Sequence, residues 1–154
     1  MESIKAVVFL AGSEEYAIPI ENVISIDKPG PVTPVPHMPD HFLGMTTVRE
    51  EVIPLVDAQK ALYPVFDGTG ETKWIVIQID GFKAGLAVKD AREIIEVQAD
   101  QLKQSGLAAY PGTHFIRGIV YIEKGRLIPV IDPQEFIGSL EGIKALKEYI
   151  EQNT

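Results

Sequence analysis

An internal repeat constrains the fold of this chain more than any other feature of its sequence. Three segments of the first half recur, in the same order, in the second half. The matched pairs are residues 7–12 with 76–81, 18–23 with 86–91, and 44–57 with 118–132. The last pair ends in two closely similar runs, Ile-Pro-Leu-Val-Asp and Ile-Pro-Val-Ile-Asp. One apolar match arises easily by chance, but three matches in one order do not, so we interpret the chain as a duplicated unit.

The repeated segments are typical of short β-strands. Most apolar runs alternate with period two, or are brief and β-branched, and polar turns separate them. The predicted strands cover residues 5–11, 16–20, 42–48, 52–57, 73–79 and 84–88. Helical turns are predicted at 21–26, leading into a strand, and at 58–62. Residues 27–41 hold five of the eleven prolines, so they are predicted to form an extended connection.

Two copies of a five-stranded unit predict small closed barrels. Open sheets of this size leave unpaired strand edges, and closure into a barrel removes them. We therefore predict a mainly β fold with two pseudo-symmetric five-stranded barrels in one domain, 1–154. The first barrel is predicted at about 16–68 with a C-terminal contribution and the second at 72–132, and the placement of strand 4–11 is left open.

The end of the chain changes to a helical pattern. Leu140, Ile143, Leu146 and Ile150 recur at spacings of three and four residues, which places them on one face of a helix. We predict an amphipathic helix over 139–152 that lies across a barrel. Gly142 disfavours helix near its start, so the first turn is expected to begin late.

Composition excludes several classes of function. The formal net charge is −8, whereas a nucleic-acid binder needs a basic surface. The chain has no cysteine, which excludes disulfide frameworks, zinc ribbons, iron–sulfur clusters and thiol catalysis. Charged residues interrupt every apolar run before the ~20 residues of a membrane span, and the N-terminus lacks a signal-peptide pattern. We expect a cytoplasmic protein that binds no nucleic acid and does not insert into the membrane.

The histidines give weak evidence for chemistry. His37 and His41 have the i, i+4 spacing of a metal-binding pair on a helix, with Asp40 between them. Because Pro36 and Pro39 break any helix there, we favour a solvated loop. No nucleophile accompanies His114, and no nucleophile-elbow motif occurs. We therefore predict no catalytic residue, no cofactor and no metal.

Arg49 is the most informative polar residue. It lies near the tip of the predicted hairpin 42–57, where a guanidinium can make a bidentate contact with a partner carboxylate or amide. A local ion pair with Glu50 or Glu51 is an equally good interpretation of the sequence. Val23 and Ile24 follow the first predicted hairpin, and one is expected in the core and the other at the surface.

Several of these segments, in this order, resemble the CheW family, the coupling proteins of bacterial chemotaxis. The residues that carry the resemblance are Glu14–Ile18 (EEYAI), Pro39 with Phe42–Gly44, Arg49 with Val52–Asp57 (VIPLVD), and Gly118 with Ile128–Asp132. The similarity covers roughly Lys5 to Ile137. It implies two SH3-like barrels, in agreement with the repeat.

The resemblance also implies a non-catalytic adaptor in signal transduction. Members of this family join the cytoplasmic tip of transmembrane chemoreceptors to the regulatory domain of the histidine kinase CheA, and barrel-to-barrel contacts extend into rings. The protein would then be cytoplasmic and recruited to membrane receptor arrays. The resemblance places Val23, Ser25 and Arg49 on the receptor-facing surface, with Glu50 beside them. A helical receptor tip laid in a groove is the expected mode of recognition.

Three positions depart from the family pattern. Thr47 replaces the usual Asn, Glu50 replaces the Gly after the arginine, and Ser25 stands where many members have a Glu that orients the arginine. Without that Glu, Glu50 or Glu51 is expected to pair with Arg49. The departures predict a divergent paralogue with a specialised receptor–kinase pair or weakened coupling.

Two alternative functions stay open on the sequence. One is a double-barrel scaffold or peptide-binding module in another signalling pathway, because a fold does not dictate its partners. The other is a small acid/base enzyme that uses His114 with Glu123 or Asp132. The enzyme requires a deep pocket with perturbed titratable groups, which two such small barrels rarely enclose.

Overall fold

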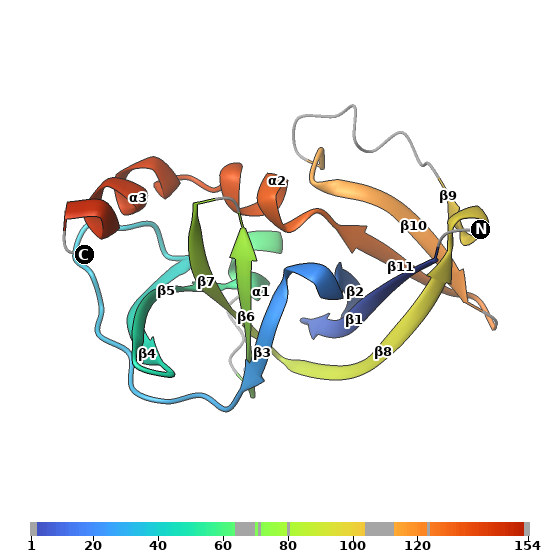
Figure 1. The fold of residues 1–154 in the computed structure, drawn as a ribbon, viewed down its shortest axis with the longest axis horizontal. Helices are drawn as coiled ribbons and strands as arrows, with labels where there is room; N and C mark the ends of the chain where they lie inside the picture. The colour runs from blue at the N-terminus through green and yellow to red at the C-terminus, as the bar shows by residue number, and fades with distance from the viewer. Residues whose placement is uncertain are drawn as a thin grey trace.

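Two β-sheets form the body of the protein, and the C-terminal helices α2 and α3 lie along one side (Figure 1). The structure, a computed structural model, describes residues 3–63, 70, 72–79, 81–103, 113–122 and 124–152. The strands are β1 (Ser3–Ala11), β2 (Glu14–Pro19), β3 (Val23–Asp27), β4 (Phe42–Val48), β5 (Glu51–Asp57), β6 (Lys73–Ile79), β7 (Phe82–Val88), β8 (Asp90–Gln98), β9 (Leu102–Lys103), β10 (Ile116–Ile122) and β11 (Arg126–Ile131). The helices are η1 (Ile20–Asn22), α1 (Ala58–Leu62), η2 (Ala99–Gln101), α2 (Pro133–Gly138) and α3 (Ile143–Gln152). The mainly β prediction is confirmed.

Corresponding strands of the two repeats lie in the same order in the two sheets, which confirms the repeat. The six-stranded sheet has the order β8-β1-β2-β11-β10-β9, and the five-stranded sheet has the order β3-β6-β7-β5-β4. Each contains one parallel pair, β2 with β11 and β5 with β7, among antiparallel neighbours. β9 pairs with β10 through Lys103 and Ile119. The equivalent pairing in the five-stranded sheet is an isolated bridge between Thr33 and Met45. The strands of one copy therefore have counterparts in the other.

The register of the first hairpins corrects the sequence alignment by one residue. Val7 pairs with Ile18, and Ile75 pairs with Leu86, so Val7 corresponds to Ile75 and not to Val76. The alignment matched Gly12 with Gly81, but these glycines occupy different positions of their two-residue turns, at φ +62° and +98°. Hairpin turns of different types accept glycine at the first or at the second position, because either position can have positive φ. A one-residue slip moves a strand's side chains to the opposite face.

Each sheet combines strands of both repeats, because the first hairpin of each repeat lies in the sheet with the later strands of the other. β3 follows β2 in the chain but pairs with β6, and β8 follows β7 but pairs with β1. The sheets therefore differ from the predicted barrel boundaries of 16–68 and 72–132, because β6 and β7 belong with β3, β4 and β5. Figure 1 shows this crossing, with blue β3 beside green β6 and yellow β8 beside blue β1. The physical reason is that exchange covers an exposed strand edge in each hairpin.

One hydrophobic core joins the two sheets. Side chains of β1 and β2 in the six-stranded sheet pack in the same cluster as side chains of β6 and β7 in the five-stranded sheet and of α2 and α3. Its fully buried members include Phe9, Ile18, Ile75, Ile77, Leu86 and Phe136. Each sheet also has a smaller core on its other face, around Val8 and Ile128 in one and Trp74 in the other.

The repeated Asp of each copy caps a short helix. The Asp57 carboxylate accepts hydrogen bonds from the backbone N–H groups of Gln59 and Lys60, at 2.9 and 3.2 Å. Asp132 does the same for Gln134 and Glu135, at 3.0 and 3.2 Å. Both residues are N-caps, which satisfy N–H groups that have no partner within the helix. The Asp that ends both copies of the repeat thus has a structural role.

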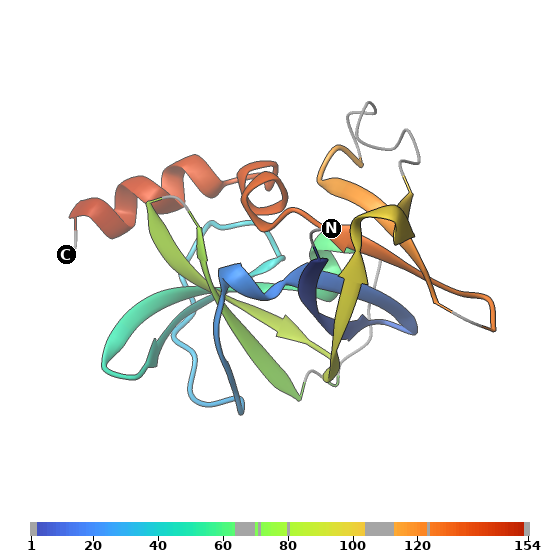
Figure 2. The ribbon, with the colours of Figure 1, turned by 45° about the vertical axis from the view of Figure 1, so that its right-hand side comes forward.

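The C-terminal helix begins later than its predicted start at residue 139. α2 ends at Gly138 and α3 begins at Ile143, and Gly142 between them has a φ of +86°. That left-handed backbone interrupts the helix, as the unfavourable propensity of glycine indicated. Figure 2 shows α3 lying along one end of the five-stranded sheet, where Leu146 joins the shared core. Among the described helices, none is long and apolar enough to cross a membrane.

Candidate interaction surface

The turn between β4 and β5 holds Arg49 in an uncommon backbone conformation. Val48 pairs with Glu51, which leaves Arg49 and Glu50 as the two turn residues. Their φ values are +51° and +70°. Such turns match the twist of a hairpin but favour Asn and Gly, since a left-handed residue with a side chain costs roughly 1–2 kcal/mol. Backbone strain of this kind clusters at functional sites.

Replacing Glu50 with glycine is therefore expected to stabilise the protein. Glu50→Gly removes the steric cost of the left-handed conformation and should raise the free energy of unfolding by about 1 kcal/mol. Chemical denaturation measures the change. Glu51→Gly is the matched control, because Glu51 is the first residue of a strand, where glycine is unfavourable. A Glu50→Gly variant less stable than the wild type would contradict the strain.

Arg49 pairs with Asp27, which corrects the expectation that Glu50 or Glu51 would be its partner. Arg49 Nη2 lies 3.6 Å from Asp27 Oδ1, and the two side chains are 68% and 26% exposed. Ser25 donates a hydrogen bond of 2.6 Å from its hydroxyl to the other carboxylate oxygen of Asp27. Ser25 and Asp27 share a face of β3 because they are two residues apart on a strand. The guanidinium is therefore held on one side and open to solvent on the other.

Glu51 pairs with a different cation. Lys83 Nζ on β7 lies 2.8 and 2.9 Å from the two carboxylate oxygens of Glu51. Sequence reasoning missed both Asp27 and Lys83. The two-residue spacing from Ser25 was a signal for Asp27, whereas Lys83 reaches Glu51 only through the parallel pairing of β5 with β7.

Exposed apolar side chains lie on the strands that carry these ion pairs. Ile24 and Ile26 on β3 are 44% and 42% exposed, and Val52 on β5 is 62% exposed. Val23 instead is half-buried and packs against the shared core, so it is the less exposed residue of the Val23–Ile24 pair. A small pocket of about 30 Å³ lies among β3, β5, β6 and β7, and its lining includes Ile24, Ser25 and Arg49.

The structure thus brings together two of the four predicted contact residues. Ser25 and Arg49 line the small pocket and share Asp27. Glu50 is exposed at the turn but does not line the pocket, and Val23 lies mainly in the core. We call Ile24, Ser25 and the Arg49 guanidinium, which line this pocket together, the Arg49 surface.

The six-stranded sheet has a differently charged cluster at the equivalent place. Arg126 Nη2 lies 2.8 Å from both Glu15 Oε2 and Glu93 Oε1, and its Nε lies 3.1 Å from Glu15 Oε1. These hydrogen bonds from Arg126 lower the pKa of the Glu15 carboxyl. Exposed apolar residues lie on this sheet too, at Ile94, Tyr121 and Leu127.

Comparison with known proteins identifies the family. The profile of the CheW-like domain matches residues 5–141, which is most of the chain. The chain belongs to the CheW-like domain family. Its function is accordingly that of a non-catalytic chemotaxis adaptor, and its partners are components of chemotaxis signalling.

Relatives of this CheW-like chain agree with the assignment. The chemotaxis protein CheW of Bacillus subtilis is 29% identical over 129 residues, 83% of each chain. The protein of the same name from Rhizobium meliloti is 30% identical over 128 residues, 82% of each chain. The crystal structure of the scaffolding protein TtCheW from Thermoanaerobacter tengcongensis has a TM-score of 0.79 at 24% identity, covering 92% of this chain and 96% of that one.

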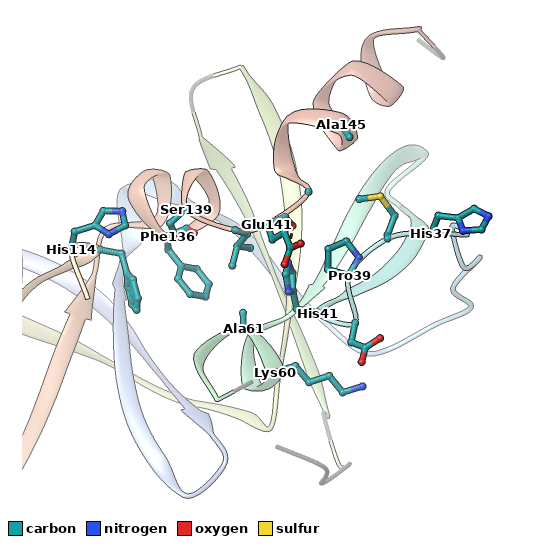
Figure 3. Close-up of a pocket in the computed structure, with 15 residues that line it drawn as sticks. His37, Pro39, His41, Lys60, Ala61, His114, Phe136, Ser139, Glu141 and Ala145 are labelled. Atoms are coloured by element: carbon teal, nitrogen blue, oxygen red, sulfur yellow. Dashed lines mark hydrogen bonds between the residues drawn. The ribbon is translucent and has the colours of Figure 1, made fainter. Parts of the chain in front are cut away.

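The histidines of this CheW-like chain all line one open hollow of about 1070 Å³ (Figure 3). His114 and His37 lie at opposite ends, with His41 and Lys60 between them. His41 Nε2 hydrogen-bonds with the Glu141 carbonyl at 3.0 Å. Within the described part of the chain, no three His, Asp or Glu side chains are placed to hold a metal ion.

His114 has an acidic neighbour other than the two that the acid/base alternative uses. Asp132 caps α2 and lies 3.3 Å from Arg117 Nη2, while His114 Nε2 lies 3.7 Å from Glu135 Oε2. Glu123, the other acid proposed for that enzyme, lies outside the described residues. A non-catalytic CheW-like family and a structural role for Asp132 both count against the enzyme.

Proposed function

We propose that this CheW-like chain is cytoplasmic, is recruited to receptor arrays, and joins the cytoplasmic tip of transmembrane chemoreceptors to the regulatory domain of the histidine kinase CheA. The receptor tip would bind the Arg49 surface. The observation that carries the proposal is an exposed guanidinium, held by Asp27 on a strained turn, beside the exposed Ile24, which lines the same pocket. An amphipathic helix fits such a surface, since its apolar face covers the aliphatic side chains and its polar edge meets the arginine.

Exposed apolar side chains on the other sheet support the role of a bridge. Ile94, Tyr121 and Leu127 lie on the six-stranded sheet, whereas the Arg49 surface lies on the five-stranded sheet. An adaptor needs two surfaces that partners can occupy at once. Exposed aromatic and aliphatic residues of this kind favour protein contacts.

Binding to each partner tests the proposal. We expect micromolar affinity for a purified CheA regulatory domain and for a receptor-tip fragment, measured separately by calorimetry. Arg49→Ala should weaken the receptor-tip interaction about tenfold or more and leave the kinase interaction unchanged, since a well-placed arginine contributes more than 1 kcal/mol at an interface. Lys124→Ala is the matched control, because Lys124 is also a cation with positive φ at a hairpin tip, in the six-stranded sheet.

The outcomes separate the parts of the proposal. Kinase binding without receptor binding would keep the adaptor role, and the weakened coupling would then be due to the departures at Ser25, Thr47 and Glu50. A full-strength receptor affinity would instead contradict weakened coupling. Absence of binding to both partners would contradict the chemotaxis role of this chain.

A further inference from the structure

The equivalent places in the two sheets have charge patterns of opposite sign. Val8 on β1 is the equivalent of Val76 on β6. Ser25 pairs with Val76 and Glu93 pairs with Val8, so Ser25 and Glu93 are equivalent. Glu51 pairs with Val48 beside the β4–β5 turn, and Arg126 pairs with Ile122 beside the β10–β11 turn. Glu51 and Arg126 are therefore equivalent. In the six-stranded sheet the carboxylate of Glu93 reaches Arg126 at 2.8 Å. The five-stranded sheet has Glu51 at that place, so a carboxylate at position 25 would face a like charge.

Asp27 provides a carboxylate on the same face of β3 without that conflict. Asp27 lies two residues after Ser25 on the strand, and its carboxylate lies 3.6 Å from the Arg49 guanidinium. The Ser25 hydroxyl, 2.6 Å away, occupies the remaining oxygen and fixes the carboxylate. Glu51 stays with Lys83. Each cation of this cluster therefore has its own carboxylate.

We propose that Asp27 is the positioning residue for Arg49, and that Ser25 acts by fixing the Asp27 carboxylate. This inference rests on the proposed receptor contact and assigns the residues that prepare it. An exposed arginine has several rotatable bonds, and ordering them on binding reduces affinity. Asp27 restricts the guanidinium before the partner arrives, so its effect appears in binding more than in stability, because exposed ion pairs contribute little to folding.

The first test uses the free protein and does not depend on any receptor. Nitrogen-15 relaxation of the Arg49 Nε–H group reports how ordered the guanidinium is. Asp27→Asn should make this group more mobile, Ser25→Ala should do so to a smaller extent, and Asp27→Glu should keep it ordered. Glu51→Gln is the matched control, because it removes the neighbouring ion pair with Lys83 and should leave Arg49 unchanged. Equal mobility of Arg49 in the wild type and Asp27→Asn would overturn the proposal.

The second test is a double-mutant cycle on binding to the receptor-tip fragment. Asp27→Asn should weaken binding about two- to fivefold in the wild-type background, the range of an exposed ion pair. In an Arg49→Lys background, where the planar guanidinium is absent, the same change should have a smaller effect. An equal loss in both backgrounds would show that Asp27 acts independently of Arg49 and would overturn the proposal.

The two tests distinguish this inference from the proposed function. If the wild type does not bind the receptor-tip fragment, the proposed receptor contact fails, and the relaxation measurement alone decides whether Asp27 orders Arg49. If binding occurs and Arg49→Ala weakens it, but Asp27→Asn changes neither mobility nor affinity, the receptor contact stands and the role of Asp27 fails.

Discussion

Phe9→Ala is expected to lower the free energy of unfolding by about 3–5 kcal/mol, the range of a buried phenylalanine replaced by alanine. Phe9 is 1% exposed and belongs to the core that the two sheets share. Its ring also stacks on Tyr16, with centroids 6.0 Å apart. The substitution opens a cavity in the core that β6 and β7 share with the sheet of Phe9, so both sheets should lose stability together.

The single tryptophan makes this expectation measurable. Trp74 lies on β6 in the five-stranded sheet, while Phe9 lies on β1 in the six-stranded sheet. In denaturant titrations of Phe9→Ala, Trp74 fluorescence and far-UV circular dichroism should shift to the same lower midpoint. A Trp74 transition that stays at the wild-type midpoint would show that the sheets unfold independently. Leu127→Ala is the control, because that side chain is 60% exposed and its loss should change stability little.

Gly44→Ala should have an effect of similar size for a different reason. Gly44 has a φ of +140°, and a Cβ atom there would lie 2.2 Å from the carbonyl oxygen of Thr33. That carbonyl accepts a 2.8 Å hydrogen bond from the Met45 N–H, so relieving the clash breaks the bridge beside β4. Backbone strain and the lost bridge together should cost about 3 kcal/mol or more.

The equivalent glycine of the other sheet is the matched control. Gly118 occupies the same kinked position of β10, where a Cβ atom would lie 2.9 Å from the Lys103 carbonyl oxygen and the Leu102 side chain. Because its φ lies outside the left-handed region, Gly118→Ala should cost less, about 1–2 kcal/mol. Chemical denaturation compares the two variants, and equal losses would contradict the special role of the Gly44 backbone.

The repeat made much of the fold predictable because local signals and pairing agree in the hairpins. The strands around Val48–Glu51 and Ala11–Glu14 follow from alternating residues and turn chemistry. The exchange of β3 and β8 was not predictable in this way, because either partner strand would satisfy the same alternation. The sequence alignment of β1 with β6 was wrong by one residue, since glycine fits either position of a hairpin turn.

The candidate site was predictable only in part. Arg49 followed from its place at a hairpin tip and from the family resemblance, and the turn is left-handed although Glu50 stands where the family has glycine. Its pairing with Asp27 was not predicted, because the acids adjacent in sequence were the obvious partners. Glu51 instead binds Lys83 on β7, and Asp27 reaches Arg49 from β3, so pairing between distant strands decides both contacts.

The central claim is that one molecule of this chain holds both partners at once. Sedimentation velocity of an equimolar mixture of the chain, the CheA regulatory domain and the receptor-tip fragment tests it most directly. We predict one complex that contains all three components, and the Arg49→Ala variant should release the receptor tip while the kinase domain stays bound. Displacement of the kinase domain by the receptor tip would contradict the account, because the two partners would then compete for one surface.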